Sequence, residues 1–198
     1  MIFLWVIPMC SMLLIRFFDI FLSIIFIIIF SPLFIIISFL IIILDGFPIL
    51  FISQRVGING NLFKMYKFRS MKIKKEKNNK DEITNLGKFL RRSSFDEFPQ
   101  FINILKNEMS IVGPRPLPLE IENQIIGEFK ILRRTIKPGI TGYSQILFNK
   151  KKRNWDEKIS QDIKYIREIS FRRYIIIIFL TFPAIIKRFR FNNKGRTL

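Results

Sequence analysis

Residues 20–43 read IFLSIIFIIIFSPLFIIISFLIII and carry no charged side chain. As a helix, this run would be about 36 Å long, which exceeds the roughly 30 Å thickness of a bilayer's hydrocarbon core. Pro32 lies near its middle and cannot donate a hydrogen bond to the carbonyl four residues earlier, so the helix must kink or break there. In lipid the freed carbonyl needs another partner, and the Ser31 hydroxyl is a nearby candidate. The run alone favours a helix that spans the membrane; the alternative is a re-entrant hairpin that enters and leaves on one face.

Charge is segregated along the chain, which has 198 residues, 49% of them apolar, and a net charge of +18. All but one of its 33 Lys and Arg residues follow residue 50, so the positive-inside rule places that part in the cytoplasm. A basic body beside a membrane indicates contact with anionic lipids, with phosphate-bearing substrates or with nucleic acid. An A/T-rich genome that encodes many Lys and Ile residues would also raise the charge without any function.

The residue types that are missing limit the chemistry. The chain has no histidine, and its single cysteine is Cys10. This composition excludes Ser-His-Asp triads, Cys-His dyads, cysteine-based zinc sites and an intramolecular disulfide. Any enzyme chemistry must use carboxylates, Lys, Tyr, Ser or Thr, and we expect a hard metal ion bound through oxygen to assist it.

The part after residue 48 is expected to be α+β and mostly helical. Two β-like runs, Leu50–Val56 and Asn61–Phe68, flank the turn signal Gly57-Ile-Asn-Gly60 and predict a β-hairpin. Helical spacing predicts amphipathic helices at residues 86–92, about 96–109, 119–134 and 155–169. The charged residues 72–82 predict a solvated loop, and the Pro/Gly-rich residues 113–116 and 137–142 predict rigid turns.

A last apolar segment covers residues 174–186 and contains Pro183. It is too short to span a bilayer, and the proline is expected to interrupt it. We expect this segment to lie in the membrane interface plane or to pack as a core helix.

Asp96 and Glu97 form the most suggestive acidic pair. They fall in the first turn of the helix expected near residues 96–109, where free N–H groups and the helix dipole favour negative charge and phosphate. Ser94 with Glu97 would make a capping box, or Asp96 would be the cap. Arg91 precedes the pair and Arg115 follows in a proline-fixed loop, and guanidinium groups suit phosphate oxygens. These groups are those used in phosphoryl transfer, although ordinary helix capping with solvated arginines explains the same pattern.

A second candidate lies in Tyr66-Lys-Phe-Arg-Ser70. Lys67 and Arg69 alternate with aromatic residues, so they are expected on one face of a strand. They are candidates for phosphate binding, and the alternative is a hairpin with one solvated face.

Eight short motifs occur together along the chain. They are Arg16-Phe-Phe-Asp19, Ser31-Pro32, Ser53-Gln-Arg-Val-Gly57, Tyr66-Lys-Phe-Arg-Ser-Met71, Leu86-Gly-Lys-Phe-Leu-Arg-Arg92, Asp96-Glu-Phe-Pro-Gln100, Asn107-Glu-Met-Ser-Ile-Val-Gly-Pro-Arg-Pro116 and Lys137-Pro-Gly-Ile-Thr-Gly142. In this order they strongly resemble the bacterial sugar transferase family, and within it the small monotopic phosphoglycosyl transferases. The resemblance runs from about residue 16 to the C-terminal helix, and the blocks at residues 96–100 and 113–116 are its most specific parts.

The resemblance implies a mechanism. Asp96 matches the nucleophile, which would attack the β-phosphorus of a UDP-sugar, release UMP and hold the sugar phosphate covalently. Undecaprenyl phosphate would then take the sugar phosphate. Glu97 matches the second acid, which would handle the proton of the lipid phosphate or help Asp96 to hold Mg²⁺. Lys67, Arg91 and Arg115 match basic positions that would bind the diphosphate.

The resemblance also implies a location. Ser31-Pro32 matches the dipeptide that breaks the membrane helix into a re-entrant hairpin, which keeps both ends cytoplasmic and replaces the spanning helix that the run alone favours. Residues 1–48 would then be the membrane-inserted segment, and residues 49–198 a catalytic domain on the cytoplasmic face of the bacterial inner membrane. Membrane lipids are expected partners, nucleic acid is not, and downstream glycosyltransferases would continue a capsule, exopolysaccharide, O-antigen or protein-linked glycan.

The chain departs from the family pattern in three places. Residues 2–15 form an apolar extension that could insert as a second membrane piece, and Lys137 stands where Arg is usual. Residues 146–154 lack the expected polar, glycine-containing loop, which leaves the sugar open. Two rival functions are a non-catalytic, membrane-anchored basic protein that binds nucleic acid or anionic lipid, and an inactive relative that acts as a scaffold.

Overall fold

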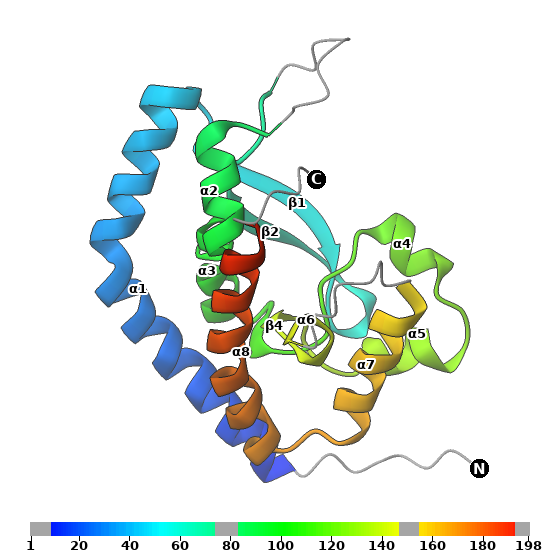
Figure 1. The fold of residues 1–198 in the computed structure, drawn as a ribbon. Helices are drawn as coiled ribbons and strands as arrows, with labels where there is room; N and C mark the ends of the chain where they lie inside the picture. Colours follow the sequence, from blue (N-terminus) through cyan, green and yellow to red (C-terminus); the bar gives the residue numbers. More distant parts are fainter. Residues whose placement is uncertain (1–8, 74–82, 147–154, 193–198) are drawn as a thin grey trace, which may run out of the picture.

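A computed structural model describes residues 9–73, 83–146 and 155–192 (Figure 1). The described part is mostly helical, as predicted, and it contains the predicted hairpin together with a second two-stranded sheet that was not predicted. Its elements are, in order, α1 (Met9–Asp45), β1 (Leu50–Val56), η1 (Ile58–Gly60), β2 (Leu62–Phe68), α2 (Asn85–Ser93), η2 (Phe95–Glu97), α3 (Gln100–Leu105), β3 (Ser110–Val112), α4 (Leu119–Gln124), α5 (Glu128–Arg133), β4 (Gly139–Thr141), α6 (Tyr143–Ile146), α7 (Trp155–Arg167) and α8 (Phe171–Asn192).

The elements are arranged in layers beside α1. Figure 1 shows α1 curving along one side of the molecule, with α2, α3 and α8 against its inner face and α4, α5 and α7 on the opposite side. Strands β1 and β2 pair antiparallel, and β3 pairs parallel with β4. Buried apolar side chains of β2, α3, α7 and α8 form the main core between these layers.

Helix α1 continues through Pro32. The Ser31 hydroxyl donates to the carbonyl of Ile28 at 2.8 Å, which is the carbonyl that the proline leaves without its helical partner. The Ser31 hydroxyl is therefore confirmed as the partner of the freed carbonyl. The expected break at Ser31-Pro32 is not confirmed, because α1 is one continuous helix that bends (Figure 1). Residues 9–15 belong to this same helix, so the expectation of a second membrane piece is wrong for them; residues 2–8 lie outside the described part.

The outer face of α1 is apolar and exposed. Its large exposed side chains include Phe21, Ile28, Ile36, Phe39 and Ile43. By length and composition the helix could cross a membrane. Contiguous apolar surface of this extent is unfavourable in water, so it indicates membrane association.

A buried aspartate fastens the N-terminal half of α1 to the body. Asp19 Oδ1 accepts hydrogen bonds from the Tyr174 hydroxyl at 2.8 Å, the Ile111 N–H at 2.9 Å and the Ser110 hydroxyl at 3.1 Å. Its exposed fraction is 1%. One carboxylate thus joins α1 to β3 and to α8, which accounts for an aspartate in the Arg16-Phe-Phe-Asp19 motif.

Two arginines donate hydrogen bonds to the last carbonyls of a helix: Arg16 of α1 at the end of α3, and Arg69 at the end of α1. Arg16 donates to the carbonyl of Ile104 at 2.8 Å, in the last turn of α3. Arg69 donates to the carbonyls of Asp45 and Gly46 at 2.5 and 2.6 Å, where α1 ends. Guanidinium groups suit these positions because the last carbonyls of a helix have no helical partner and carry partial negative charge.

Aromatic contacts join the middle of α1 to the segment after Glu97. Phe26 stacks on Phe101, with ring centroids 3.9 Å apart and 15° between the planes, and meets Phe98 edge-on at 4.7 Å. Phe34 also packs on Phe98, at 5.9 Å. The start of α3 is therefore seated against the membrane helix.

The hairpin and the helix at residues 86–92 are confirmed. The strands pair from Leu50 with Phe68 to Val56 with Leu62, one residue shorter in the second strand than predicted. Helix α2 begins after Thr84, whose hydroxyl accepts the Gly87 N–H at 2.9 Å as an N-cap.

The helix expected at residues 96–109 differs from the prediction. It is divided into the 3₁₀ turn η2 and the short helix α3, and Asp96 and Glu97 belong to the turn. Ser94 takes a left-handed conformation with φ of 61°, and its side chain makes no capping hydrogen bond, so the capping-box prediction is wrong. Ser94 instead forms the left-handed C-cap of α2, and η2 begins directly after it.

Two further helices also differ in extent. The stretch 119–134 is split into α4 and α5 by Gly127, whose φ of 66° glycine adopts without strain. Helix α8 is longer than the predicted 174–186 and passes through Pro183 without ending, because a proline removes one helical hydrogen bond and leaves the others. Its buried residues Tyr174 and Ile177 pack in the core, while Phe179 is exposed.

Candidate active site

Asp96 and Glu97 lie in η2, which packs against α2 and β2. Asp96 is buried, with 9% of its surface exposed. Glu97 Oε1 accepts from Lys67 Nζ at 2.7 Å, and the two side chains are about one-fifth exposed, at 19% and 18%. The structure therefore brings the predicted lysine of the hairpin to the predicted acidic pair, although 30 residues separate them.

A buried asparagine sets this geometry. Asn103 of α3 accepts from the Tyr66 N–H at 3.1 Å and donates to the Lys64 carbonyl at 2.7 Å. It has no exposed surface, so both hydrogen bonds form away from water. Because Tyr66 directly precedes Lys67, these bonds hold the lysine strand against the segment that follows Glu97.

A pocket of about 150 Å³ opens between the hairpin, η2, α4 and the loop after β3. Three cations, one acid and two amides face it, beside an apolar wall. These residues are Arg55, Lys67, Arg115, Glu97, Gln100 and Gln145, with Met65, Leu117, Ile121 and Ile140 among the apolar ones. Such a pocket can bind an anionic group through its cations and an apolar or planar group against its wall.

Arg55 is a pocket residue to which sequence reasoning gave no role, although it lies within the Ser53-Gln-Arg-Val-Gly57 motif. Burial and the charge of Arg115 lower the pKa of Arg55, and the charge of Glu120 partly offsets this. Two guanidinium groups that repel each other across a pocket are relieved by an anion between them. The electrostatics therefore favour a phosphate-bearing ligand.

Two glycine-rich loops hold the backbone next to Arg115. The Gly113 N–H donates to the Thr141 carbonyl, and the Gly139 N–H donates to the Pro114 carbonyl, both at 2.9 Å. A Cβ atom on Gly139 would lie 2.0 Å from the Gly113 nitrogen, so no larger residue fits there. The two rigid turns predicted from the sequence are thus packed against each other, backbone to backbone.

The other predicted residues lie elsewhere. Arg91 donates to the Ser70 hydroxyl at 2.8 Å, and Arg69 reaches the end of α1. Within residues 9–73, 83–146 and 155–192, neither Asp96 nor Arg91 lines the pocket described above. Of the predicted phosphate-binding residues, the pocket therefore gathers Lys67 and Arg115.

The model of the bacterial sugar transferase family matches residues 10–188. The chain belongs to this family. The match covers α1, the hairpin, the acidic pair and both glycine-rich loops, so the motifs that carried the resemblance fall within it.

Individual relatives differ in length. This sugar transferase is 39% identical over 160 residues to the galactosyl transferase CpsE of Streptococcus agalactiae serotype III (strain NEM316), covering 72% of this chain and 35% of that protein. It is 43% identical over 148 residues to the UDP-glucose:undecaprenyl-phosphate glucose-1-phosphate transferase of Escherichia coli (strain K12), covering 68% and 32%. Over 175 residues it is 33% identical to the uncharacterized sugar transferase EpsL of Bacillus subtilis (strain 168), covering 86% of each. The chain thus spans about a third of the first two relatives and most of the third.

The acidic pair of this sugar transferase suits a substrate-assisted metal site. The described residues contain no group of three or more acids, histidines or cysteines that would cage a metal ion. Magnesium is commonly held by one or two carboxylates plus substrate phosphates. Asp96 and Glu97 are consecutive carboxylates in η2, and Glu97 is also paired with Lys67. The residues present therefore fit Mg²⁺ if a phosphate-bearing ligand completes its coordination.

Proposed function

We propose that this sugar transferase moves a sugar 1-phosphate from a UDP-sugar to undecaprenyl phosphate and releases UMP, as the first membrane step of surface glycan assembly. The observation that carries the proposal is one pocket lined by Arg55, Lys67 and Arg115 together with Glu97, the residue that follows Asp96 in η2. A relative named for glucose-1-phosphate transfer to undecaprenyl phosphate supports the donor and acceptor classes.

In the first half-reaction the Asp96 carboxylate attacks the β-phosphorus of the donor. The bond from that phosphorus to the oxygen bridging to the α-phosphorus breaks, and UMP leaves with its electron pair. The sugar phosphate remains on Asp96 as a mixed anhydride. Arg55, Lys67 and Arg115 neutralise the charge of the diphosphate, so that the negatively charged Asp96 carboxylate can approach its phosphorus.

In the second half-reaction an oxygen of undecaprenyl phosphate attacks the same phosphorus. The bond to Asp96 breaks, which regenerates the carboxylate and forms the polyprenyl-diphosphate sugar. Glu97, held by Lys67 at 2.7 Å, takes the proton of the lipid phosphate. The alternative role of Glu97 is to help Asp96 to hold Mg²⁺ when the donor binds, where the ion would screen the negative charge of the phosphates.

The proposed membrane arrangement is re-entrant. Residues 1–48 enter and leave the inner membrane on its cytoplasmic face, and residues 49–198 act there as the catalytic domain. The bend of α1, whose concave side faces the body in Figure 1, supports this, as does the positive charge that follows residue 50.

The proposal is tested by measuring UMP release from a panel of UDP-sugars. We expect one donor to release a single equivalent of UMP per protein without acceptor, and to turn over when undecaprenyl phosphate is added. Chelating Mg²⁺ should abolish both the initial release of UMP and the turnover. Turnover that requires both substrates together, with no initial equivalent of UMP, would contradict the covalent mechanism. A protein that only binds anionic lipid or nucleic acid would release no UMP and would respond mainly to salt.

Arg55→Ala tests the part that the pocket plays in donor binding. Because a hydrogen bond to a charged group contributes about 1.5–3 kcal/mol, we expect the donor KM to rise roughly tenfold to a hundredfold. Lys88→Ala removes a positive charge from an exposed position on α2 and is the control; it should leave the donor KM unchanged. Equal effects of the two variants would mean that the pocket attracts the donor only through the net charge of the protein.

A further inference from the structure

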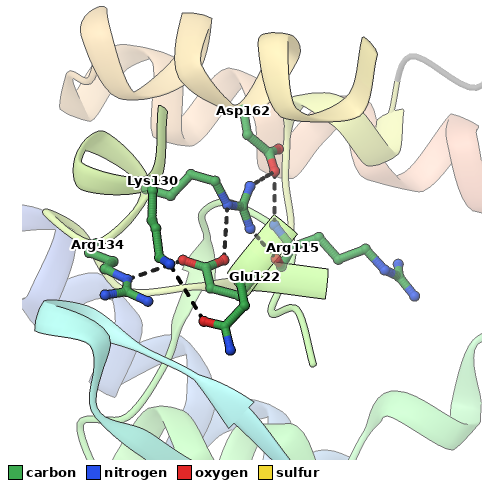
Figure 2. Close-up of polar contacts among 7 residues, drawn as sticks. Arg115, Glu122, Lys130, Arg134 and Asp162 are labelled. Carbon is green, nitrogen blue, oxygen red and sulfur yellow. Dashed lines mark hydrogen bonds and ion pairs between the residues drawn. The ribbon is translucent and has the colours of Figure 1, made fainter. Parts of the chain in front are cut away.

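A buried ionic network contacts the main chain of Arg115 and joins α4, α5 and α7 (Figure 2). Arg133 donates to Asp162 Oδ2 at 2.5 Å, and its Nε lies 3.6 Å from Glu122 Oε2. Arg134 donates to the other oxygen of Glu122 at 3.2 Å. The side chains of Arg133, Glu122 and Asp162 are 5%, 3% and 4% exposed. Burying such a network contributes little to stability by itself, because the cost of desolvation offsets the attraction.

The network also holds the main chain of Arg115 on both sides. The N–H of Arg115 donates to Asp162 Oδ2 at 3.3 Å, and its carbonyl accepts from Arg133 at 2.7 Å. The same carboxylate oxygen therefore bonds both to Arg133 and to the Arg115 backbone. In Figure 2 the Arg115 side chain extends away from the network, and this side chain lines the pocket with Lys67 and Glu97.

The position of Arg115 between two prolines gives these two hydrogen bonds a specific effect. Pro114 and Pro116 each fix their own φ angle, so the direction of the Arg115 side chain depends mainly on its own φ and ψ. The orientations of its N–H and its carbonyl report those two angles. Holding both groups with buried partners therefore fixes the direction of the Cα–Cβ bond.

We propose that Asp162 and Arg133 are positioning residues of the donor site, which fix the main chain of Arg115 and so start its side chain toward the pocket that would bind the phosphates of the UDP-sugar. This inference rests on the proposed function. Neither residue touches the donor; both act through Arg115. A displacement of about 1 Å at such a contact can cost a hundredfold in rate.

The test is a double-mutant cycle on the donor kcat/KM for UMP release. Asp162→Ala should lower it about tenfold to a hundredfold. In an Arg115→Ala background, Asp162→Ala should change it less than about twofold, because the group through which it acts is already gone. If Asp162→Ala lowers the donor kcat/KM by the same factor in wild type and in Arg115→Ala, the positioning role is overturned. Asp162→Asn keeps an oxygen acceptor for the Arg115 N–H and should restore part of the loss, and it replaces the alanine variant if that variant does not fold.

Glu122→Gln is the matched control. Glu122 is as buried as Asp162 and pairs with the same Arg133, but the hydrogen bonds to the Arg115 main chain come from Asp162 and Arg133. We expect it to lower thermal stability as much as Asp162→Asn does and to leave the donor kcat/KM within about threefold of wild type. An equal loss of donor kcat/KM in Glu122→Gln would show that the network is only structural.

Amide hydrogen exchange tests, without any donor substrate, whether Asp162 holds the main chain of Arg115. In Asp162→Ala the Arg115 amide should exchange faster than in wild type, while the amides of β1 and β2 should not change. Unchanged exchange at Arg115 would overturn the inference. Wild-type protein that releases no UMP from any donor would instead refute the proposed function, whereas active wild type with the same factor in both backgrounds refutes the positioning role alone.

Discussion

Asp96→Asn should abolish UMP release. An amide is a poor nucleophile, so we expect kcat to fall on the order of a thousandfold or more. The covalent species gives a direct measurement: wild type mixed with the donor and no acceptor should gain the mass of one sugar phosphate, on the peptide that contains Asp96. The variant should gain none.

Glu128→Gln is the control for the loss of one negative charge. Glu128 is exposed on α5, where it pairs with Arg167, and its replacement should leave both UMP release and the mass gain intact. A mass gain at a different residue, or UMP release by Asp96→Asn at the wild-type rate, would remove Asp96 from the role of nucleophile.

Asp19→Ala should produce the largest loss of stability. It leaves the Tyr174 hydroxyl, the Ser110 hydroxyl and the Ile111 N–H without their buried acceptor. At about 1–3 kcal/mol for an unsatisfied buried group, with partial relaxation, we expect a loss of about 2–4 kcal/mol. For a chain of this size that corresponds to a Tm lower by roughly 5–15 °C, measured by thermal unfolding in detergent micelles.

Asp45→Ala is the control for Asp19→Ala, because Asp45 lies on the same helix and its side chain accepts from Thr84 at 2.9 Å. Its loss should be clearly smaller. Asp19→Asn keeps an acceptor oxygen and should recover part of the stability. If both alanine variants lower Tm equally, Asp19 is not the group that fastens α1.

Local sequence signals predicted local structure well. The hairpin, α2 and α7 follow from alternation, turn residues and helical spacing, and the Ser31 hydroxyl follows from the carbonyl that Pro32 leaves free. The prolines were misleading where the rest of the helix outweighs one missing hydrogen bond, as at Pro183 in α8. The contact between Phe98 and Phe26 of α1 was not predictable, since the two residues lie 72 positions apart in the sequence.

In the candidate site, too, some residues were predictable from the sequence and others were not. Lys67 and Arg115 were predicted and line one pocket, whereas Arg91 lies at Ser70. Arg55 was missed because a single arginine on a strand has no periodic signal that distinguishes it from a solvated one. The bond between Arg133 and Asp162 joins residues 29 apart on two helices, and nothing in either helix alone indicates it.

The stacking of Phe26 on Phe101 also fixes the position of the acidic segment relative to α1. It sets how far the segment carrying Asp96 and Glu97 stands from the axis of α1, so if α1 rests in the lipid, the acidic pair is held at a constant height above the acyl chains. A polyprenyl phosphate that diffuses in the leaflet then arrives with its headgroup already level with the acids, and its tail need not leave the bilayer.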